Sequence, residues 1–221
     1  MLSTLELVAM AQDGTPRRDT YRHGDLRNTL IKAGLDLARA GGPQAVVLRA
    51  ATRQAGVVPN AAYRHFADRG ALLHAVSQAA MAQVARTMEA EQAALPPTTD
   101  AAAAARARFR AVGTGYLRFA QEEPGLFRTA FHVPGDMTHA AADTSAGATG
   151  KTPFELLGAA LDDLVEAGLL PEDRRPGAEF LAWSAVHGLA ALLIDGPLRG
   201  LAPTQAHDAG QQVIDMIERG L

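Results

Sequence analysis

Residues 48–66 read LRAATRQAGVVPNAAYRHF, and this stretch decides the predicted fold. The sequence predicts a first short helix over Leu48–Ala55 that ends at Gly56. Pro59 suits the first position of a second short helix, which we expect to end near Phe66. Two short helices joined by a glycine-containing turn have helix-turn-helix geometry, in which the second helix enters the major groove of DNA. Because such turns also occur in other helical proteins, the pattern alone leaves the function open.

Outside this stretch, apolar residues recur at helical spacing along most of the chain. Asp25 and Asp68 stand where N-caps are expected, and Gly41-Gly42-Pro43 ends the first of these helices. Aromatic residues make up only 5 % of the chain, and this favours helices over sheets. We therefore predict an all-α fold, with a three-helix N-terminal head and a C-terminal helical regulatory and dimerisation domain. The expected helices span residues 25–40, 48–55, 59–66, 69–93, 100–123, 124–131, 153–167, 179–194 and 204–218.

The same pattern divides the chain into three parts. Residues 1–20 form a flexible N-terminal arm, residues 21–67 a helix-turn-helix DNA-binding domain, and residues 68–221 a ligand-binding and dimerisation domain. Within the last part, residues 134–152 are rich in Gly, Ala, Thr and Asp and are expected to form a loop. A loop of this length either gates a pocket or is disordered.

Composition excludes several classes of protein. The chain has 221 residues and no cysteine, which excludes disulfides, thiolate zinc sites and cysteine nucleophiles. The longest nearly apolar run, residues 189–194, is far shorter than the roughly 18 residues that a membrane-spanning helix needs. The N-terminus also lacks the pattern of a secretory signal. We therefore expect a cytoplasmic protein with no membrane segment.

Charge is distributed unevenly along the chain. Residues 15–75 contain ten Arg and Lys against four Asp, a net charge of +6, whereas the whole chain carries −3. The remainder therefore carries −9. A basic end on an acidic body favours a polyanionic partner such as DNA, because clustered Arg and Lys attract phosphates. The alternative is an ordinary solvated surface.

The second short helix carries side chains suited to DNA. Arg64 can grip guanine O6 and N7, and Asn60 can pair with adenine. Tyr63 and His65 can bond phosphates while presenting a flat apolar side. Three further arginines near the turn fit phosphate anchoring: Arg49, Arg53 and Arg69.

Motifs at both ends of the chain resemble one known family. The sequence is similar to the N-terminal domain of tetracycline-repressor-like (TetR/AcrR) transcriptional regulators in YRHGDLR at 21–27, LR at 48–49, GV at 56–57, Pro59, YRHF at 63–66 and LL at 72–73. WSAVHG at 183–188, followed by DG at 195–196, resembles the WHG-type C-terminal domain found in one branch of that family. Together these matches span most of the chain.

The resemblance implies a homodimeric regulator of transcription, most simply a repressor. Each subunit would offer its head to a pseudo-palindromic double-stranded DNA operator, and a small apolar or amphipathic effector would change the distance between the heads. Arg69 falls where the family usually has a phosphate-binding lysine. The DNA-binding residues implied by position are Arg22, Arg49, Val58, Asn60, Ala61, Tyr63, Arg64, His65 and Arg69.

Two positions depart from the family pattern. Val47 and Val58 stand where Ser or Thr commonly precede the two short helices. Valine accepts no hydrogen bond from the backbone N–H groups of a helix start, and a lost cap typically costs about 1 kcal/mol. We therefore expect a less rigid head.

Two further predictions concern the C-terminal domain. Residues 179–194 are apolar nearly all round, and residues 204–218 place Ala206, Gly210, Val213 and Ile217 on one face. The simplest way to bury these apolar faces is to pack them against the same pair of helices from a second subunit, although both helices would also fit inside one monomer's core. The candidate effector-binding residues, which are otherwise core aromatics, are Tyr116, Phe119, Phe127, Phe131, Phe180, Trp183 and His187.

Enzymatic alternatives are poorly supported, and we expect neither catalysis nor a cofactor. The TGKT stretch at 149–152 mimics the end of a phosphate-binding loop, but no strand precedes it and a proline follows. His132, Asp136, His139 and Asp143 lack recognised zinc spacing. Ser184, His187 and Asp195 are the components of a hydrolase triad without a nucleophile elbow. The competing function is a helical small-molecule-binding or hydrolase-like protein that does not bind DNA.

Overall fold

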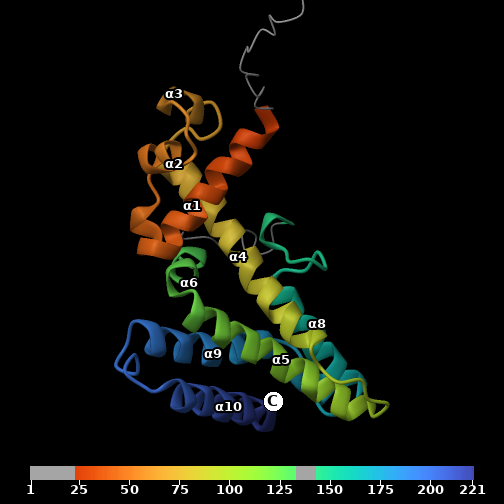
Figure 1. Cartoon of the computed structure of the whole chain (residues 1–221). Helices are drawn as coiled ribbons and strands as arrows, with labels where there is room; N and C mark the ends of the chain where they lie inside the picture. The colour runs from red at the N-terminus through yellow and green to blue at the C-terminus, as the bar shows by residue number, and fades with distance from the viewer. Residues whose placement is uncertain (1–22, 133–142) are drawn as a thin grey trace, which may run out of the picture.

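The computed structural model describes residues 23–132 and 143–221, and all regular secondary structure in these ranges is helical (Figure 1). The predicted all-α fold is confirmed. Residues 1–20, Arg22 and residues 134–142 of the predicted 134–152 loop lie outside the described residues. No helix in the described ranges is long and apolar enough to cross a membrane.

Three helices form the head: α1 (His23–Ala45), α2 (Leu48–Gln54) and α3 (Pro59–Ala62). Gly41 and Gly42 leave helical geometry, and Gly42 adopts a φ of 68°, so the regular part of α1 ends where the sequence predicted. Asp25 lies inside α1 and not at its cap, because the helix begins at His23. As expected, neither Val47 nor Val58 caps its helix through a side-chain hydrogen bond.

The second short helix is shorter than predicted. Its α-helical part ends at Ala62, and Tyr63, Arg64 and His65 follow in turns. The amides of His65 and Phe66 both donate to the Ala62 carbonyl, which keeps this segment coiled. Phe66, which follows these turns, is buried in the core.

The body follows the predicted order of helices. Asp68 caps α4 and Asp100 caps α5, each by accepting from the amide three residues later. Thr152 and Glu155 form a capping box at the start of α8. The elements are α4 (Arg69–Ala93), α5 (Ala101–Glu122), α6 (Pro124–Ala130), η1 (Asp143–Ser145), α8 (Pro153–Glu166), η2 (Glu172–Arg174), α9 (Ala178–Ile194) and α10 (Pro203–Gly220).

Helix α4 connects the two ends of the molecule. In Figure 1, α2 and α3 lie at one end, α9 and α10 lie at the other, and α4 runs between them. Small residues allow close helix crossings: a Cβ on Gly115 would lie 2.7 Å from the Met88 Cα, and one on Gly125 would strike the Ala38 carbonyl. Helix α5 therefore packs closely against α4, and α6 packs closely against α1 of the head.

Helix α10 is covered within the monomer along part of its length. Ala206, Gly210 and Ile217, three of the four residues predicted on one face, are buried, and Val213 is half-buried. This face packs against α5 and α9 of the same chain. For these residues the intramolecular alternative holds.

Candidate functional site

Four exposed residues lie on α3 or directly beside it in sequence, at the outer end of the head, and we term them the recognition surface: Val58, Asn60, Tyr63 and Arg64. Val58 is 68 % exposed and Tyr63 is 57 % exposed, although both are large and apolar or aromatic. The side chains of Asn60 and Arg64 are also exposed. An aromatic ring, an amide and a guanidinium presented together are the groups that bond DNA phosphates and base edges.

Buried residues hold this surface in place. Ala62 and Phe66 are buried in the head core, and the Arg27 guanidinium carbon lies 5.5 Å from the centre of the Phe66 ring. Ala61 and His65, two of the predicted DNA-binding residues, are half-buried. Each is next in sequence to a residue of the recognition surface.

Arg69 fixes the start of α4 to the corner between α1 and α2. Its Nε donates to the Val46 carbonyl at 2.9 Å and one terminal nitrogen donates to the Pro43 carbonyl at 2.8 Å. The predicted phosphate contact stays a prediction, and the exposed Arg69 guanidinium already bonds the protein backbone. Arg49 is also exposed, on α2. Arg69 thus couples the orientation of the head to α4.

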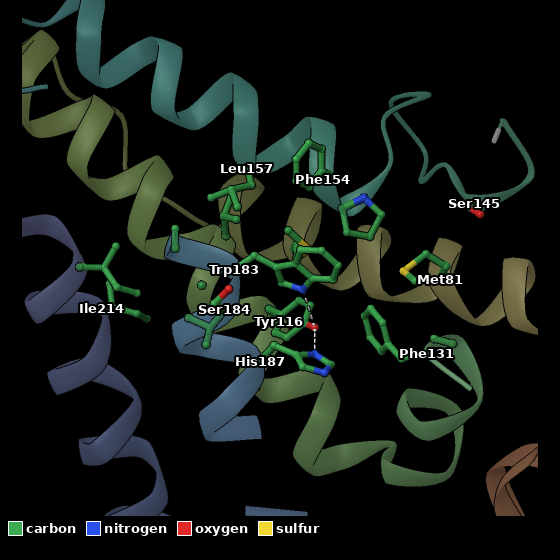
Figure 2. Close-up of a pocket in the computed structure, with 18 of the residues that line it drawn as sticks. Met81, Tyr116, Phe131, Ser145, Phe154, Leu157, Trp183, Ser184, His187 and Ile214 are labelled. Carbon is green, nitrogen blue, oxygen red and sulfur yellow. Dashed lines mark hydrogen bonds between the residues drawn. The ribbon is translucent and has the colours of Figure 1, made fainter. Parts of the chain in front are cut away.

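A cavity of about 470 Å³ lies among α4, α5, α6, α8, α9 and α10. Met81, Phe154 and Leu157 line it together with four of the predicted aromatic positions, which are Tyr116, Phe131, Trp183 and His187 (Figure 2). No Asp, Glu, Lys or Arg is found on its wall among the described residues. Its size falls in the usual range for small-molecule sites.

Three other predicted residues do not line this cavity. Phe119 and Phe127 are buried. Phe127 stacks behind His187 with ring centres 5.6 Å apart. Phe180 is half-exposed on α9 and contacts Phe154 with ring centres 5.7 Å apart. Phe154, which directly follows Pro153 in an amphipathic helix, was not among the residues predicted from the sequence.

A hydrogen-bonded trio lies on the cavity wall. The Trp183 indole nitrogen donates to the Tyr116 hydroxyl at 3.2 Å, and this hydroxyl lies 2.7 Å from Nδ1 of His187. Burial raises the pKa of the Tyr116 phenol, and the bond from Trp183 opposes this only in part. Burial also lowers the pKa of His187. Both side chains are therefore neutral at neutral pH.

The alternative hydrolase triad is not assembled. Nδ1 of His187 is bonded to Tyr116, and the carboxylate of Asp195 is paired with Arg128 at 2.7 Å. No group of three or more His, Asp or Glu suited to a metal ion occurs in residues 23–132 and 143–221. Asp136 and His139 of the alternative metal cluster lie outside these residues.

The loop that mimics a phosphate-binding motif is occupied by a side chain of this protein. The Glu89 carboxylate accepts from the amides of Ala148 and Thr149 at 2.7 and 2.9 Å, and from the Thr149 hydroxyl at 2.6 Å. A Cβ on Gly147 would meet this carboxylate. Glu89 therefore joins α4 to the segment that brings Ser145 to the cavity wall.

Replacement of Glu89 is expected to make stability less dependent on pH. Burial raises the pKa of Glu89, but the bonds from Thr149 and Ala148 outweigh it and leave the pKa below its ordinary value of 4.5. A carboxylate with a lowered pKa stabilises the fold above that value and loses its contribution as pH falls through the folded value. Glu89→Gln should cost up to about 1 kcal/mol near pH 7, since solvent screens this site, and less near pH 3.5. Urea unfolding at both pH values measures this, with the exposed Glu166→Gln as control. An equal loss of unfolding free energy at both pH values would contradict the prediction.

Comparison with known proteins identifies the family. The sequence model described as "Tetracyclin repressor-like, C-terminal domain" matches residues 109–217, which include Tyr116, Trp183 and His187. The chain is a TetR-type regulator. A search of curated proteins finds no match.

Solved structures share the fold of this TetR-type regulator along most of their length. A protein of unknown function from Rhodococcus sp. RHA1 is 26 % identical, with a TM-score of 0.69 over 92 % of this chain and 98 % of that one. A TetR family transcription regulator from Marinobacter aquaeolei VT8 is 19 % identical, with a TM-score of 0.57 over 87 % and 95 %. SmeT, the repressor of the Stenotrophomonas maltophilia multidrug efflux pump SmeDEF, is 16 % identical, with a TM-score of 0.58 over 88 % and 89 %. The fold is that of TetR-family transcription regulators.

Proposed function

We propose that this TetR-type regulator is a cytoplasmic repressor that binds operator DNA as a homodimer and is released by a small apolar or amphipathic effector. The proposal rests on one observation: helix α4 connects the head, which carries the exposed recognition surface, to a cavity whose described wall has no Asp, Glu, Lys or Arg. Helix α4 begins at Arg69, whose guanidinium bonds the corner between α1 and α2 and which we term the Arg69 clamp. The same helix contributes Ser77, Gln78 and Met81 to the cavity wall. A ligand there contacts the same helix that orients the head.

The proposed DNA contacts divide into two kinds. Arg64 and Asn60 would bond base edges in the major groove, whereas Tyr63, His65 and Arg49 would bond the phosphate backbone. The basic charge of residues 15–75 supports this, because phosphate contacts supply most of the affinity for any DNA sequence. Arg69 would contribute to DNA binding mainly by holding the head, given its bonds to Pro43 and Val46.

The proposed dimer interface lies on α9. Leu181 is 67 % exposed and Leu192 is 43 % exposed, and Ser184 and Gly188 lie between them on the same helical face. Met216 of α10 adds an apolar side chain that is 57 % exposed. An apolar face with small residues at its centre suits close packing against the same face of a second copy, as twofold symmetry requires.

Release would follow from a change in head spacing. The two heads of a dimer must lie about 34–36 Å apart, or a multiple of this, to enter successive major grooves. A ligand shifts this equilibrium only when it binds one spacing more tightly than the other. A ligand that pushes α4 against the Arg69 clamp would stabilise a spacing that lets only one head dock.

Binding to the DNA upstream of the protein's own gene tests the function. Fluorescence anisotropy should show sequence-specific binding whose affinity falls at least about tenfold between about 50 mM and about 200 mM salt. A scrambled duplex of the same length is the control. Affinity that is indifferent to both sequence and salt would reject DNA regulation.

A further inference from the structure

The hydrogen bonds of the cavity trio can all be formed, with the Tyr116 hydroxyl also donating, in one tautomer of His187. An indole nitrogen only donates, so Tyr116 accepts from Trp183 and keeps its own phenolic proton to donate. Nδ1 of His187, at 2.7 Å, is the acceptor found for that proton among the described residues. A neutral His187 that accepts at Nδ1 must carry its proton on Nε2.

This Nε2–H group is left for another partner. No hydrogen bond to Nε2 of His187 is found among the described residues. Every polar side-chain atom of these residues that is shut off from solvent has a hydrogen-bond partner. Phe127 stacks on one side of the imidazole and Phe131 meets it edge on, with ring centres 5.6 and 4.9 Å away. The aromatic rings and the bond to Tyr116 therefore hold the imidazole in one orientation (Figure 2).

The other wall residues determine the charge of a ligand that fits. The described wall carries no Asp, Glu, Lys or Arg, so a carboxylate or an ammonium group would be buried without one of these side chains as a counter-charge. Burial of an unpaired charge is strongly unfavourable, whereas a neutral oxygen needs only one donor. Ser77, the buried hydroxyl of α4, already donates to the Ala130 carbonyl at 3.0 Å.

We propose that the cavity binds a neutral, mainly apolar molecule with a carbonyl oxygen, such as a ketone, ester or lactone, and that this oxygen accepts from Nε2–H of His187. The inference rests on the proposed effector cavity and names its ligand class. Tyr116 acts as a positioning residue, because it sets the tautomer and orientation of the imidazole. Carboxylates of the same length are rejected.

Three probes that differ in one group test this proposal: 2-undecanone, undecane and undecanoate. Trp183 is the only tryptophan of the chain and lies on the wall, so its fluorescence reports binding, and calorimetry confirms it. Near pH 8 the ketone should bind about 3- to 10-fold more tightly than the alkane, the range expected for one neutral hydrogen bond. Undecanoate should bind at least about tenfold more weakly than the ketone.

Variants assign the preference to the trio. His187→Leu should bind ketone and alkane equally, and Tyr116→Phe should reduce the preference without abolishing alkane binding. His207→Leu, an exposed histidine of α10, is the matched control and should keep the full preference. Circular dichroism confirms that each variant is folded.

Three results would overturn the inference: undecanoate binding as tightly as the ketone, a ketone preference that survives in His187→Leu, or no ketone binding up to its solubility limit.

These titrations contain no DNA, so their outcome does not depend on operator binding. If the ketone binds but leaves DNA affinity unchanged, the ligand class stands and the proposed release mechanism fails. If the chain binds no specific DNA, the regulatory function fails while the ligand class is unaffected.

Discussion

Gly188→Arg is expected to convert the homodimer to monomers and to lower operator affinity by about 100-fold or more. Gly188 lies on the exposed face of α9 between Leu181 and Leu192, and a Cβ there meets nothing within 4 Å in the monomer. The arginine therefore leaves the monomer fold intact but places bulk and an unpaired charge at the centre of the proposed interface. Loss of the dimer removes the avidity of two linked heads, which commonly contributes 10²- to 10⁴-fold.

Analytical ultracentrifugation and anisotropy on the same samples measure both effects. Gly200→Arg is the matched control, since Gly200 is exposed between α9 and α10 and a Cβ there also meets nothing within 4 Å. It adds the same charge and should stay dimeric with full affinity. A half-operator should bind wild type and Gly188→Arg alike, because only one head is used. A Gly188→Arg protein that remains dimeric would place the interface elsewhere.

Much of the fold was predictable because local signals and tertiary packing agree. Asp68 and Asp100 cap the helices that follow them, and proline marks the first turn of α6, α8 and α10. Helix α3 was predicted too long: residues 63–65 adopt turns, and Phe66 after them lies in the core of the head. That contact is made with distant residues and leaves no local sequence signal.

The site was less predictable than the fold. The sequence shows that Trp183 and His187 share a helical face but not which neighbouring aromatics share their cavity, so Phe119 and Phe127 could not be separated from Tyr116 and Phe131. For Arg69, the family resemblance indicated a charge near phosphate. Its bonds to the Pro43 and Val46 carbonyls depend on how the α1–α2 corner folds against α4, which spacing along the chain does not reveal.

Arg64→Ala is expected to relax the sequence preference of the protein and to cost about 1–3 kcal/mol of binding free energy per head. In a dimer on a palindromic operator, the effect applies twice and reaches about 2–6 kcal/mol. The exposed Arg64 lies directly after Tyr63 on the recognition surface, in the coiled segment held by the Ala62 carbonyl. Loss of a bidentate contact to guanine removes discrimination at one base pair of each half-site. Anisotropy with a set of single-base operator variants measures this.

Arg69→Ala should behave differently, and the comparison separates base contacts from support of the head. Without its bonds to Pro43 and Val46, the α1–α2 corner loosens, so affinity should fall on every sequence alike and the melting temperature should fall as well. Arg64→Ala should leave the melting temperature unchanged, since its side chain is exposed. Arg86→Ala, exposed on α4 away from the head, controls for the lost charge. Because a phosphate contact is blind to the base, equal losses from Arg64→Ala on all operator variants would show that Arg64 binds the DNA backbone and not a base.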